Sequence, residues 1–536
     1  MPFFDLHCHP SFKSGLLNDD VMSCPNPVDA VDIKLKVPFS ECVELLVGNS
    51  LDSQASFGQI PGGSLVVASF LAFERVYAFV DDLKKIKNLG EHILDNMQKQ
   101  VKAYHHILID RDIAHFQAFL ANQTNRRHYQ LLTNITEYPA TPDPNTVYVV
   151  ASVEGGHNFY TQKDLVEQEK NPQEIIDALI TWKEHSKKHP AQFPRLFYIT
   201  MTHHGQNVLA NHAWAIPIRF AANKVEVGSF DPTGNGISPF GETFLKVALR
   251  ETPTENRILI DVKHLSLASR KRVYEIFQSD PTLNDVPLLA THMGVAGCSW
   301  DTPPIAKGGI RRPSDRPKNT IVTYKPIGGF LREKSPGELV NIPFNPWSIN
   351  LYNEDIVQIM RTRGLIGISM DRRIIGSILA NKDVEDERFS KEEFPKDWVE
   401  DPQTFSFYPQ KALPHLFNGQ PSPSLHDLWT FCQSVVHISL ITELAKNEGK
   451  VPADLNPWDH ICLGSDYDGL ISALKKAPTA DHLESLFNEE MKTVLTAMVA
   501  QLNANQITLN PLQVPNDIVE KLSISNGQAF LEKHFV

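Results

Sequence analysis

The sequence has few cysteines, and none of them form a closely spaced pair. Only 6 cysteines occur in 536 residues, and no C-x-x-C motif is among them. At this chain size, widely spaced cysteines argue against a disulfide scaffold. The spacing therefore predicts free thiols in a reducing compartment. Since no secretory signal precedes the first apolar run, we expect a cytoplasmic protein.

Long runs of one charge sign are also missing, as are long apolar runs. The net charge is −12, from 51 Lys and Arg against 63 Asp and Glu. This balance lacks the basic footprint of nucleic-acid binding, so we expect no nucleic-acid partner. No apolar stretch approaches the roughly 20 residues that cross a bilayer, and the C-terminus carries no lipidation signal. We therefore expect no membrane association.

What the chain does contain is apolar material for a large core, at 42% hydrophobic residues. Its length fits one large domain or two to three smaller ones. Eight short apolar runs, mostly separated by helical or polar segments, recur at 3–7, 65–70, 147–153, 196–201, 258–262, 286–290, 365–370 and 461–464. Apolar strands that alternate with helices indicate βαβ units. Eight such units predict an α/β fold, the (β/α)8 TIM-type barrel, with its active site at the strands' C-terminal ends.

Three stretches exceed what such a barrel needs. They are a largely helical stretch at about 74–132, a Pro/Gly-rich one at 298–346 and a charged, Pro-rich one at 383–423. They follow the second, sixth and seventh predicted strands, the side on which a barrel carries its loops. We therefore predict a single hydrolase-type barrel domain over 1–536 with three insertions.

The most informative local pattern is Asp5-Leu6-His7-Cys8-His9, directly after an apolar opening. Residues i and i+2 share one face of a strand, so the rings of His7 and His9 can hold one metal ion. Neutral imidazole is the commonest ligand of zinc-type ions. In a chain with 21 histidines the pattern is weak alone, and its weight comes from residues further along.

Five more candidate residues lie at or just beyond the ends of predicted strands: Glu154, His203, His264, His292 and Asp466. In a closed barrel these strand ends meet on one rim. A lone residue of this kind is more often a helix cap or a satisfied polar group, but five on one rim are hard to obtain by chance. The rim would supply enough nitrogen and oxygen ligands for two zinc-type ions bridged by a carboxylate.

The segments around these residues resemble the membrane (renal) dipeptidase family of the amidohydrolase superfamily. The segments are Val-Glu-Gly-Gly-His at 153–157, Thr-Met-Thr-His at 200–203, Ile-Asp-Val-Lys-His-Leu-Ser at 260–266, Thr-His at 291–292 and Gly-Ser-Asp-Tyr-Asp-Gly at 464–469. They occur in the family's order, and the resemblance covers nearly the whole chain except the insertions.

The resemblance implies a (β/α)8 barrel with a binuclear zinc site that hydrolyses dipeptides. Carried over by position, His7 and His9 would bind one zinc ion and Glu154 would bridge both. His264 and His292 would bind the second ion. The implied cofactor is therefore two zinc ions, and the implied partner is a small-molecule or dipeptide substrate.

The resemblance assigns two further residues to catalysis. His203 would polarise or position the substrate carbonyl, and Asp466 would handle the proton of the attacking hydroxide. This chemistry is consistent in itself, because a metal-activated water attacks the carbonyl while a carboxylate relays a proton to the leaving amine.

The sequence departs from the family pattern at two places. The usual first-strand motif is His-x-Asp, whereas this chain has His7-x-His9, so its site is one charge more positive. The arginine that follows the position of His292 and grips the substrate carboxylate is missing. Arg311 and Arg312 could substitute for it as substrate-binding residues, with the alternative that they are solvated loop residues.

The sequence thus predicts a metal-dependent hydrolase that cleaves an amide bond in a small substrate such as a dipeptide. Two alternatives are another amidohydrolase reaction, lactone opening or deamination, and a metal-binding protein without catalysis. The second is disfavoured because a purely structural metal site would need neither His203 nor Asp466. The sequence does not fix the oligomeric state, and a homodimer is one form we consider.

Overall fold

The computed structural model describes residues 1–12, 53–56, 58–71, 128–161, 165–205, 207–214, 231–311, 320–326, 344–377, 386–400, 423–504 and 510–536. Its strands are β1 Phe4–Cys8, β2 Leu65–Phe70, β3 His128–Leu131, β4 Thr146–Glu154, β5 Leu196–Thr200, β6 Leu259–Asp261, β7 Leu289–Met293, β8 Ile321–Tyr324, β9 Leu365–Ile368, β10 Glu387–Ser390 and β11 Ile461–Leu463. Its α-helices are α7 Leu165–Lys170, α8 Gln173–Lys188, α9 Pro239–Leu249, α10 Leu267–Ser279, α11 Asn353–Arg361, α12 Pro423–Asn447, α13 Glu489–Ala504, α14 Ile518–Glu520 and α15 Asn526–His534. Shorter helical turns are η6 Ile135–Glu137, η7 Gly156–Phe159, η9 Pro281–Leu283, η12 Pro457–His460, η13 Ala480–Ser485 and η14 Lys521–Ser525.

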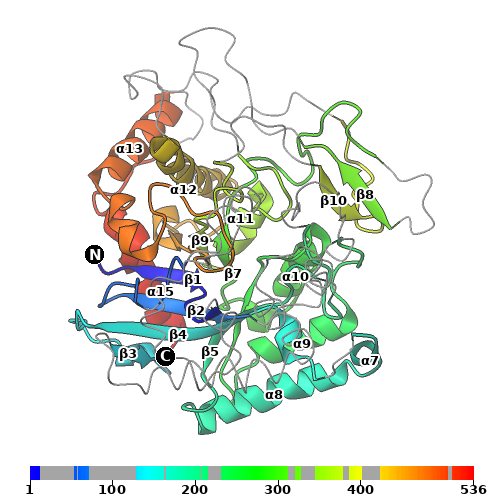
Figure 1. The fold of residues 1–536 in the computed structure, drawn as a ribbon. Coiled ribbons are helices and arrows are strands. Elements are labelled where there is room, and N and C mark those ends of the chain that lie inside the picture. Colours follow the sequence, from blue (N-terminus) through cyan, green and yellow to red (C-terminus); the bar gives the residue numbers. More distant parts are fainter. Residues whose placement is uncertain are drawn as a thin grey trace, which may run out of the picture.

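Eight parallel strands form one sheet in the order β1-β2-β4-β5-β6-β7-β9-β11 (Figure 1). The sheet closes between its first strand and the segment after its last one, because the Asp466 amide donates to the His7 carbonyl at 2.8 Å and the His9 amide to the Tyr467 carbonyl at 2.9 Å. Helices surround the sheet, with α9 packed on β6, α11 and α12 on β9, and α15 on β1 and β11. The predicted (β/α)8 barrel is confirmed.

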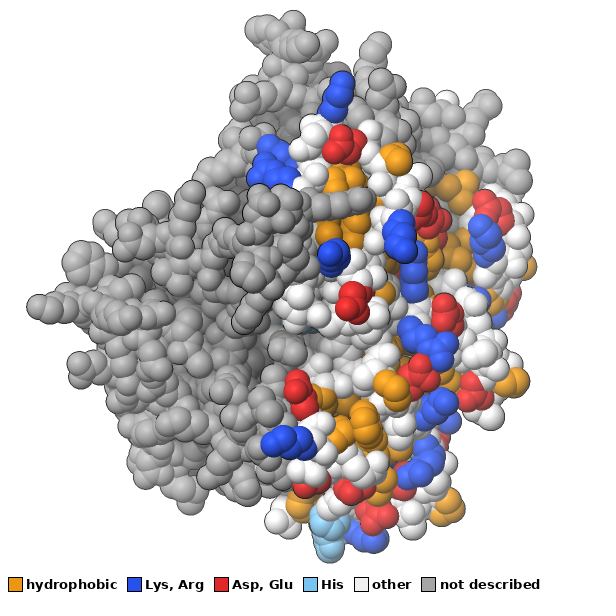
Figure 2. Space-filling model, turned by 90° about the vertical axis from the view of Figure 1, so that its right-hand side faces the viewer, with side chains coloured by type: hydrophobic (Ala, Val, Ile, Leu, Met, Phe, Trp, Pro, Cys, Tyr) orange, Lys and Arg blue, Asp and Glu red, His pale blue; other side chains and the backbone are white. Residues whose placement is uncertain are grey.

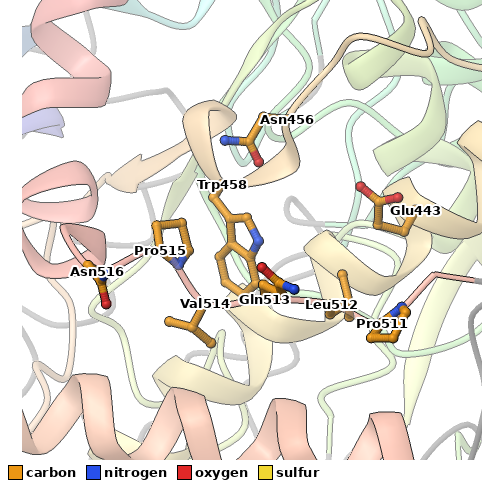
Figure 3. Close-up of a pocket in the computed structure, with 9 residues that line it drawn as sticks. All are labelled: Glu443, Asn456, Trp458, Pro511, Leu512, Gln513, Val514, Pro515 and Asn516. Atoms are coloured by element: carbon orange, nitrogen blue, oxygen red, sulfur yellow. The ribbon is translucent and has the colours of Figure 1, made fainter.

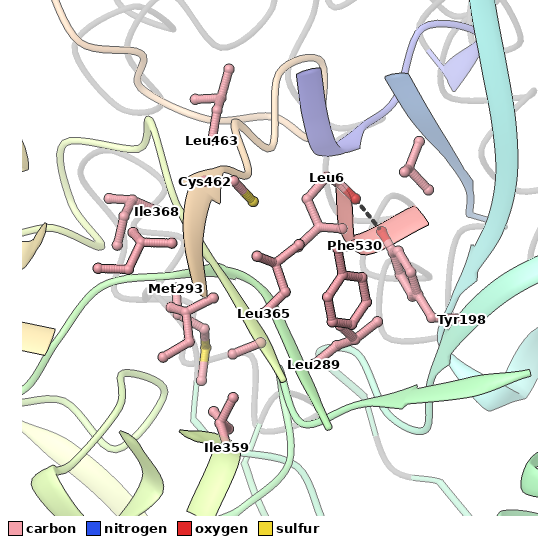
Figure 4. Close-up of a cluster of buried hydrophobic side chains, with 14 of the residues drawn as sticks. Leu6, Tyr198, Leu289, Met293, Ile359, Leu365, Ile368, Cys462, Leu463 and Phe530 are labelled. Carbon is pink, nitrogen blue, oxygen red and sulfur yellow. Dashed lines mark hydrogen bonds between the residues drawn. The ribbon is translucent and has the colours of Figure 1, made fainter. Parts of the chain in front are cut away.

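The eight predicted apolar runs coincide with the eight barrel strands. The largest difference is at β7, which runs over Leu289–Met293 rather than 286–290. Buried apolar side chains of the strands and the surrounding helices form one core, which includes Leu6, Tyr198 and Leu289, close together in Figure 4. Strands buried on both faces account for the continuous apolar runs in the sequence.

Helix α12 corrects one expectation from the sequence. Its segment His426–Asn447 is long and apolar enough to cross a membrane by length and composition, although no such stretch was expected. In the structure, 89% of this apolar stretch is buried inside the protein. A core helix passes the same test, and α12 packs against α11, α13 and β9.

The first insertion was predicted as a largely helical stretch at about 74–132. Its last residues form β3, which pairs in parallel with the start of β4 and lies outside the barrel order. The rest of the stretch, up to residue 127, lies outside the described residues.

The other two insertions meet each other in space. Strand β8 of one pairs antiparallel with β10 of the other, and the two strands lie to one side of the barrel in Figure 1. A separate apolar cluster stabilises the pair: Val322, Tyr324, Phe389, Phe394 and Trp398. Glu393, just after β10, accepts a hydrogen bond from Ser266 at the start of α10. This β8–β10 extension therefore lies on the strand-end side of the barrel, and the single-domain organisation stays a prediction.

The described cysteines Cys8, Cys298, Cys432 and Cys462 are buried free thiols, as predicted, while Cys24 and Cys42 lie outside the described residues. On the face drawn in Figure 2, acidic and basic side chains alternate over the described surface. This mixture agrees with the lack of single-sign runs in the sequence.

Candidate metal centre

The strand ends bring all seven predicted rim residues together. His7 lies in β1, Glu154 ends β4 and His292 lies in β7, while the others follow β1, β5, β6 and β11. Three-residue groups within metal-binding distance of one another include His7, His9 and Glu154, and also Glu154, His264 and His292. Both groups contain Glu154, so one carboxylate joins them.

Glu154 lies between the imidazoles with one oxygen toward each side. Its Oε1 is 3.0 Å from Nε2 of His264, 3.3 Å from Nε2 of His292 and 3.6 Å from Nε2 of His7. Its Oε2 is 3.2 Å from Nε2 of His9 and 3.8 Å from Nε2 of His203. A carboxylate with its two oxygens turned to different sets of nitrogen donors has the arrangement that a bridging metal ligand requires.

Hydrogen bonds on the far side of the rings fix which nitrogen faces the centre. The Tyr198 hydroxyl donates to the Leu6 carbonyl (Figure 4). It therefore accepts from Nδ1–H of His7 at 2.6 Å. Nδ1–H of His9 donates to the Ser69 carbonyl at 2.9 Å. Both rings therefore present the Nε2 lone pair to the centre, the orientation that outer hydrogen bonds impose on metal-ligating histidines.

A hydrogen bond on the far side of the ring also orients His292. The Thr291 hydroxyl donates to Asp261 at 2.6 Å and so accepts from Nδ1–H of His292 at 2.9 Å. Asp261 also accepts from the amides of Thr291 and Lys263. Asp261 thus helps to orient His292 through Thr291 and does not cap the next helix, which Ser266 caps.

The orientations of His7 and His9 leave their Nε2 lone pairs facing one another. Nε2 of His7 is 3.0 Å from Nε2 of His9, and Nε2 of His264 is 3.3 Å from Nε2 of His292. Two lone pairs at this distance repel unless a proton or cation lies between them. The donor set of four imidazoles and a shared carboxylate therefore fits two zinc-type ions.

The pKa values of His9 and Glu154 also favour a cation at the centre. Burial lowers the pKa of His9, but the carboxylates of Asp466 and Glu154 raise it to about 10 overall. Burial would raise the pKa of Glu154, yet the imidazoles of His203 and His7 hold it well below its usual range. Positive charge is thus favoured between the rings and the carboxylate, and a metal ion would compete with protons for that position.

The backbone is unusual at two of the site residues. His264 has φ of 64° and Asp466 has φ of 60°, in the left-handed region that non-glycine residues rarely adopt. Gly155 follows Glu154 with φ of 93°, and a side chain there would meet His157. Strained conformations of this kind are kept where the surrounding structure holds a functional group in place.

Asp466 is held by the closure of the barrel and is the most accessible of the carboxylates at the centre. Its Oδ1 is 3.4 Å from Nε2 of His9, and its side chain is 15% exposed against 2% for Glu154. Asp5 links the two sides of this closure by accepting from the amides of His7 and Ser465. Asp466 can therefore reach both the centre and an incoming molecule.

Three residues near the centre were not predicted from the sequence. His204 packs against His203, with ring centroids 3.8 Å apart. Its position next to His203 in the chain was the only signal for it in the sequence. Lys263 is buried directly before His264, where a charged residue in an apolar strand end could have been noticed. Tyr198 gave no signal, because an aromatic residue in an apolar strand indicates core packing.

The predicted substrate-binding arginines are not part of this cluster in the described structure. Arg311 pairs with Asp386 at 3.4 Å, and its side chain is 68% exposed. Its backbone pairs with Thr323 in β8. Arg312 lies outside the described residues, so a substrate-binding role for either arginine stays a prediction.

A pocket of about 470 Å³ lies elsewhere, between α12 and the segment 511–516 (Figure 3). Trp458, Glu443 and Asn456 are among the residues that line it. None of the rim histidines or carboxylates lines it, so it is separate from the metal centre.

No protein-family model matches this chain, and no curated protein matches it. Among solved structures, it is similar to the dipeptidase AC, a metallopeptidase of family M19, with 13% identity, a TM-score of 0.42 and coverage of 100% of this chain and 99% of that one. It is also similar to a Rhodobacter sphaeroides metallopeptidase bound to a phosphinate mimic of L-Ala-D-Ala, with 12% identity, a TM-score of 0.40 and coverage of 100% of this chain and 99% of that one. A third similar structure is a Pseudomonas aeruginosa amidohydrolase, with 10% identity, a TM-score of 0.39 and coverage of 100% of this chain and 96% of that one. These proteins are of the kind that the motifs resemble, but at TM-scores below 0.5 the likeness assigns no function to this chain.

Proposed function

We propose that this protein is a metal-dependent hydrolase that cleaves an amide bond in a small substrate such as a dipeptide. The observation that carries this proposal is the position of Glu154, with its two oxygens turned to two sets of histidine nitrogens. His7 and His9 would hold one zinc ion, and His264 and His292 the other, with Glu154 between them. Two bound zinc ions would supply Lewis acidity and lower the pKa of a water molecule.

His203 is suited to act on the substrate rather than on the metals. Among the five predicted rim histidines, its Nε2 is the most distant from Glu154, at 3.8 Å, and its side chain is 8% exposed. An imidazole N–H in this position can donate to the carbonyl oxygen of the scissile amide and stabilise the negative charge that develops on it.

Asp466 is suited to carry the proton. Its carboxylate faces His9 and His7 and is more accessible than Glu154. A carboxylate that accepts the proton of the attacking water can pass it to the leaving amine, which departs poorly as an anion. Because His203 and Asp466 are suited to catalysis, the site fits a hydrolase better than a metal-binding protein without catalysis.

The test combines metal analysis with a hydrolysis screen. Elemental analysis of protein purified with zinc supplied should return two ions per chain, and the screen should cover dipeptides, N-acyl amino acids and lactones. Amide cleavage by the two-ion protein would support the proposal. One or no tightly bound ion would overturn the binuclear site, and lactone opening without amide cleavage would favour the alternative amidohydrolase reaction.

A further inference from the structure

Lys263 is a buried lysine whose charge faces the metal centre. It directly precedes His264, and its side chain is 1% exposed. Burial lowers the pKa of its ammonium to about 8, and the carboxylates of Asp466, Glu154, Asp261 and Asp371 oppose this shift. These residues follow or end different strands of the barrel, so the ammonium is directed into the rim.

The ammonium of Lys263 has no partner in the described structure. Its Nζ forms no hydrogen bond, and no carboxylate of the described residues lies within 4.0 Å of it. Lys183, the other lysine that is buried among the described residues, behaves differently: its Nζ donates to the carbonyls of Val247, Ala248 and Arg250. A lysine that serves packing is satisfied by the protein itself, whereas Lys263 has three N–H groups left for a molecule that enters the site.

The nearby acids do not explain Lys263 as a structural counter-ion. Asp371 is already paired with Arg373 at 2.7 Å, and Asp261 accepts from the Thr291 hydroxyl at 2.6 Å. With two divalent ions bound, Glu154 and Asp466 would balance only half of the metal charge. Lys263 adds to the excess, so the occupied site attracts a further anion.

We propose that Lys263 is a substrate-binding residue whose ammonium holds the free carboxylate of the amide substrate. This inference rests on the proposed function and narrows its substrate class to dipeptides and N-acyl amino acids. In this proposal, Lys263 binds the substrate carboxylate in place of the arginine that is missing after His292. An ammonium is a point charge without the planar fork of arginine, so it would accept carboxylates in a wider range of orientations.

The test measures binding separately from turnover. The probes are a phosphinate analogue of Ala-Ala with a free carboxylate and the same analogue as its carboxamide, titrated by calorimetry into the zinc-loaded protein. The proteins are the wild type, Lys263→Met, Lys263→Arg and the control Lys271→Met, which removes a half-exposed lysine that contacts Trp300. Metal content is measured for each.

Wild type should prefer the carboxylate analogue by about 10- to 100-fold, the range of a charge-assisted hydrogen bond. Lys263→Met should lose that preference with both zinc ions retained, and Lys271→Met should keep it. For cleavage of Ala-Ala, Lys263→Met should raise KM more than it lowers kcat. Retention of preference by Lys263→Arg would support the role of charge.

Two results would overturn the proposal. One is a wild type that binds both analogues equally while still cleaving amides, which leaves the hydrolase function standing. The other is a carboxylate preference that survives Lys263→Met but disappears in Arg311→Ala or Arg312→Ala. Failure of the hydrolase function itself would appear separately, as a wild type without two metal ions or without amide cleavage.

Discussion

Among the described residues, Glu154 and Glu387 are the most deeply buried glutamates, and their surroundings give them opposite properties. Glu154 is 1% exposed and Glu387, in the β8–β10 extension, is 0% exposed. Imidazoles hold the pKa of Glu154 well below its usual range against the effect of burial. Burial raises the pKa of Glu387 to about 7, although the Ser348 amide and the Tyr324 hydroxyl hydrogen-bond to it.

The comparison shows that burial of a carboxylate does not make a metal site. Glu387 has a phenol and an amide beside it and favours its neutral form, as an isolated acid in an apolar cluster does. Glu154 has imidazole nitrogens on both oxygens and stays ionised. The surrounding donors, rather than depth in the protein, decide which acid can bind a cation.

The largest expected effect comes from Glu154→Gln. The variant keeps the shape of the side chain but removes the negative charge between the histidine pairs, so metal content should fall from two ions toward none. Amide cleavage should fall to the background rate. Elemental analysis and a dipeptide assay would check both, with Glu387→Gln as the matched control that keeps metal and activity. Retention of two ions in Glu154→Gln would contradict the bridging role.

Asp466→Asn should lower kcat by roughly 10²-fold or more, the scale of a lost general acid/base group. Asparagine tolerates the left-handed backbone at this position, so the fold should be kept. Elemental analysis should still find most of the metal, in contrast to Glu154→Gln. Equal losses of metal and rate would make Asp466 chiefly a ligand.

Removal of one hydroxyl should have a smaller effect. Tyr198→Phe deletes the acceptor that orients His7, and loss of such an outer contact typically costs about 10- to 100-fold in metal affinity. Tyr324→Phe removes the matching hydroxyl beside Glu387 and should leave metal affinity unchanged. Competition with a zinc chelator measures both. Equal affinities in the two variants would show that Tyr198 does not orient the ligand.

The smallest effect on activity, and the clearest on pH dependence, is expected for Glu387→Gln. Because folding raises the pKa of Glu387 from 4.5 to about 7, the protonated form favours the folded state. Protonated Glu387 stabilises the folded state by about 3 kcal/mol below pH 4.5, and this contribution is lost as the pH rises through 7. Denaturant unfolding at pH 4.5 and pH 8 should therefore show the variant gaining stability relative to wild type at the higher pH. A pH-independent difference would contradict the raised pKa.

Much of the barrel was predictable, because each strand is defined by local sequence. The apolar runs matched all eight barrel strands, and the rim residues lay close because parallel strand ends meet on one side. The pairing of β8 with β10 was not predictable, since it joins two insertions far apart in the chain. For the same reason no pattern marked Tyr198 as the partner of His7.

The sequence by itself determined that His7 and His9 share a strand face, since alternation along a strand is a local property. It also determined which residue types stand at the strand ends, and hence which metals would suit them. Only the tertiary structure decided that Glu154 lies between two histidine pairs and that Lys263, rather than Arg311, faces the centre. The reason is that these relations depend on the closure of the barrel and on side-chain directions, which strands separated by tens to hundreds of residues set together.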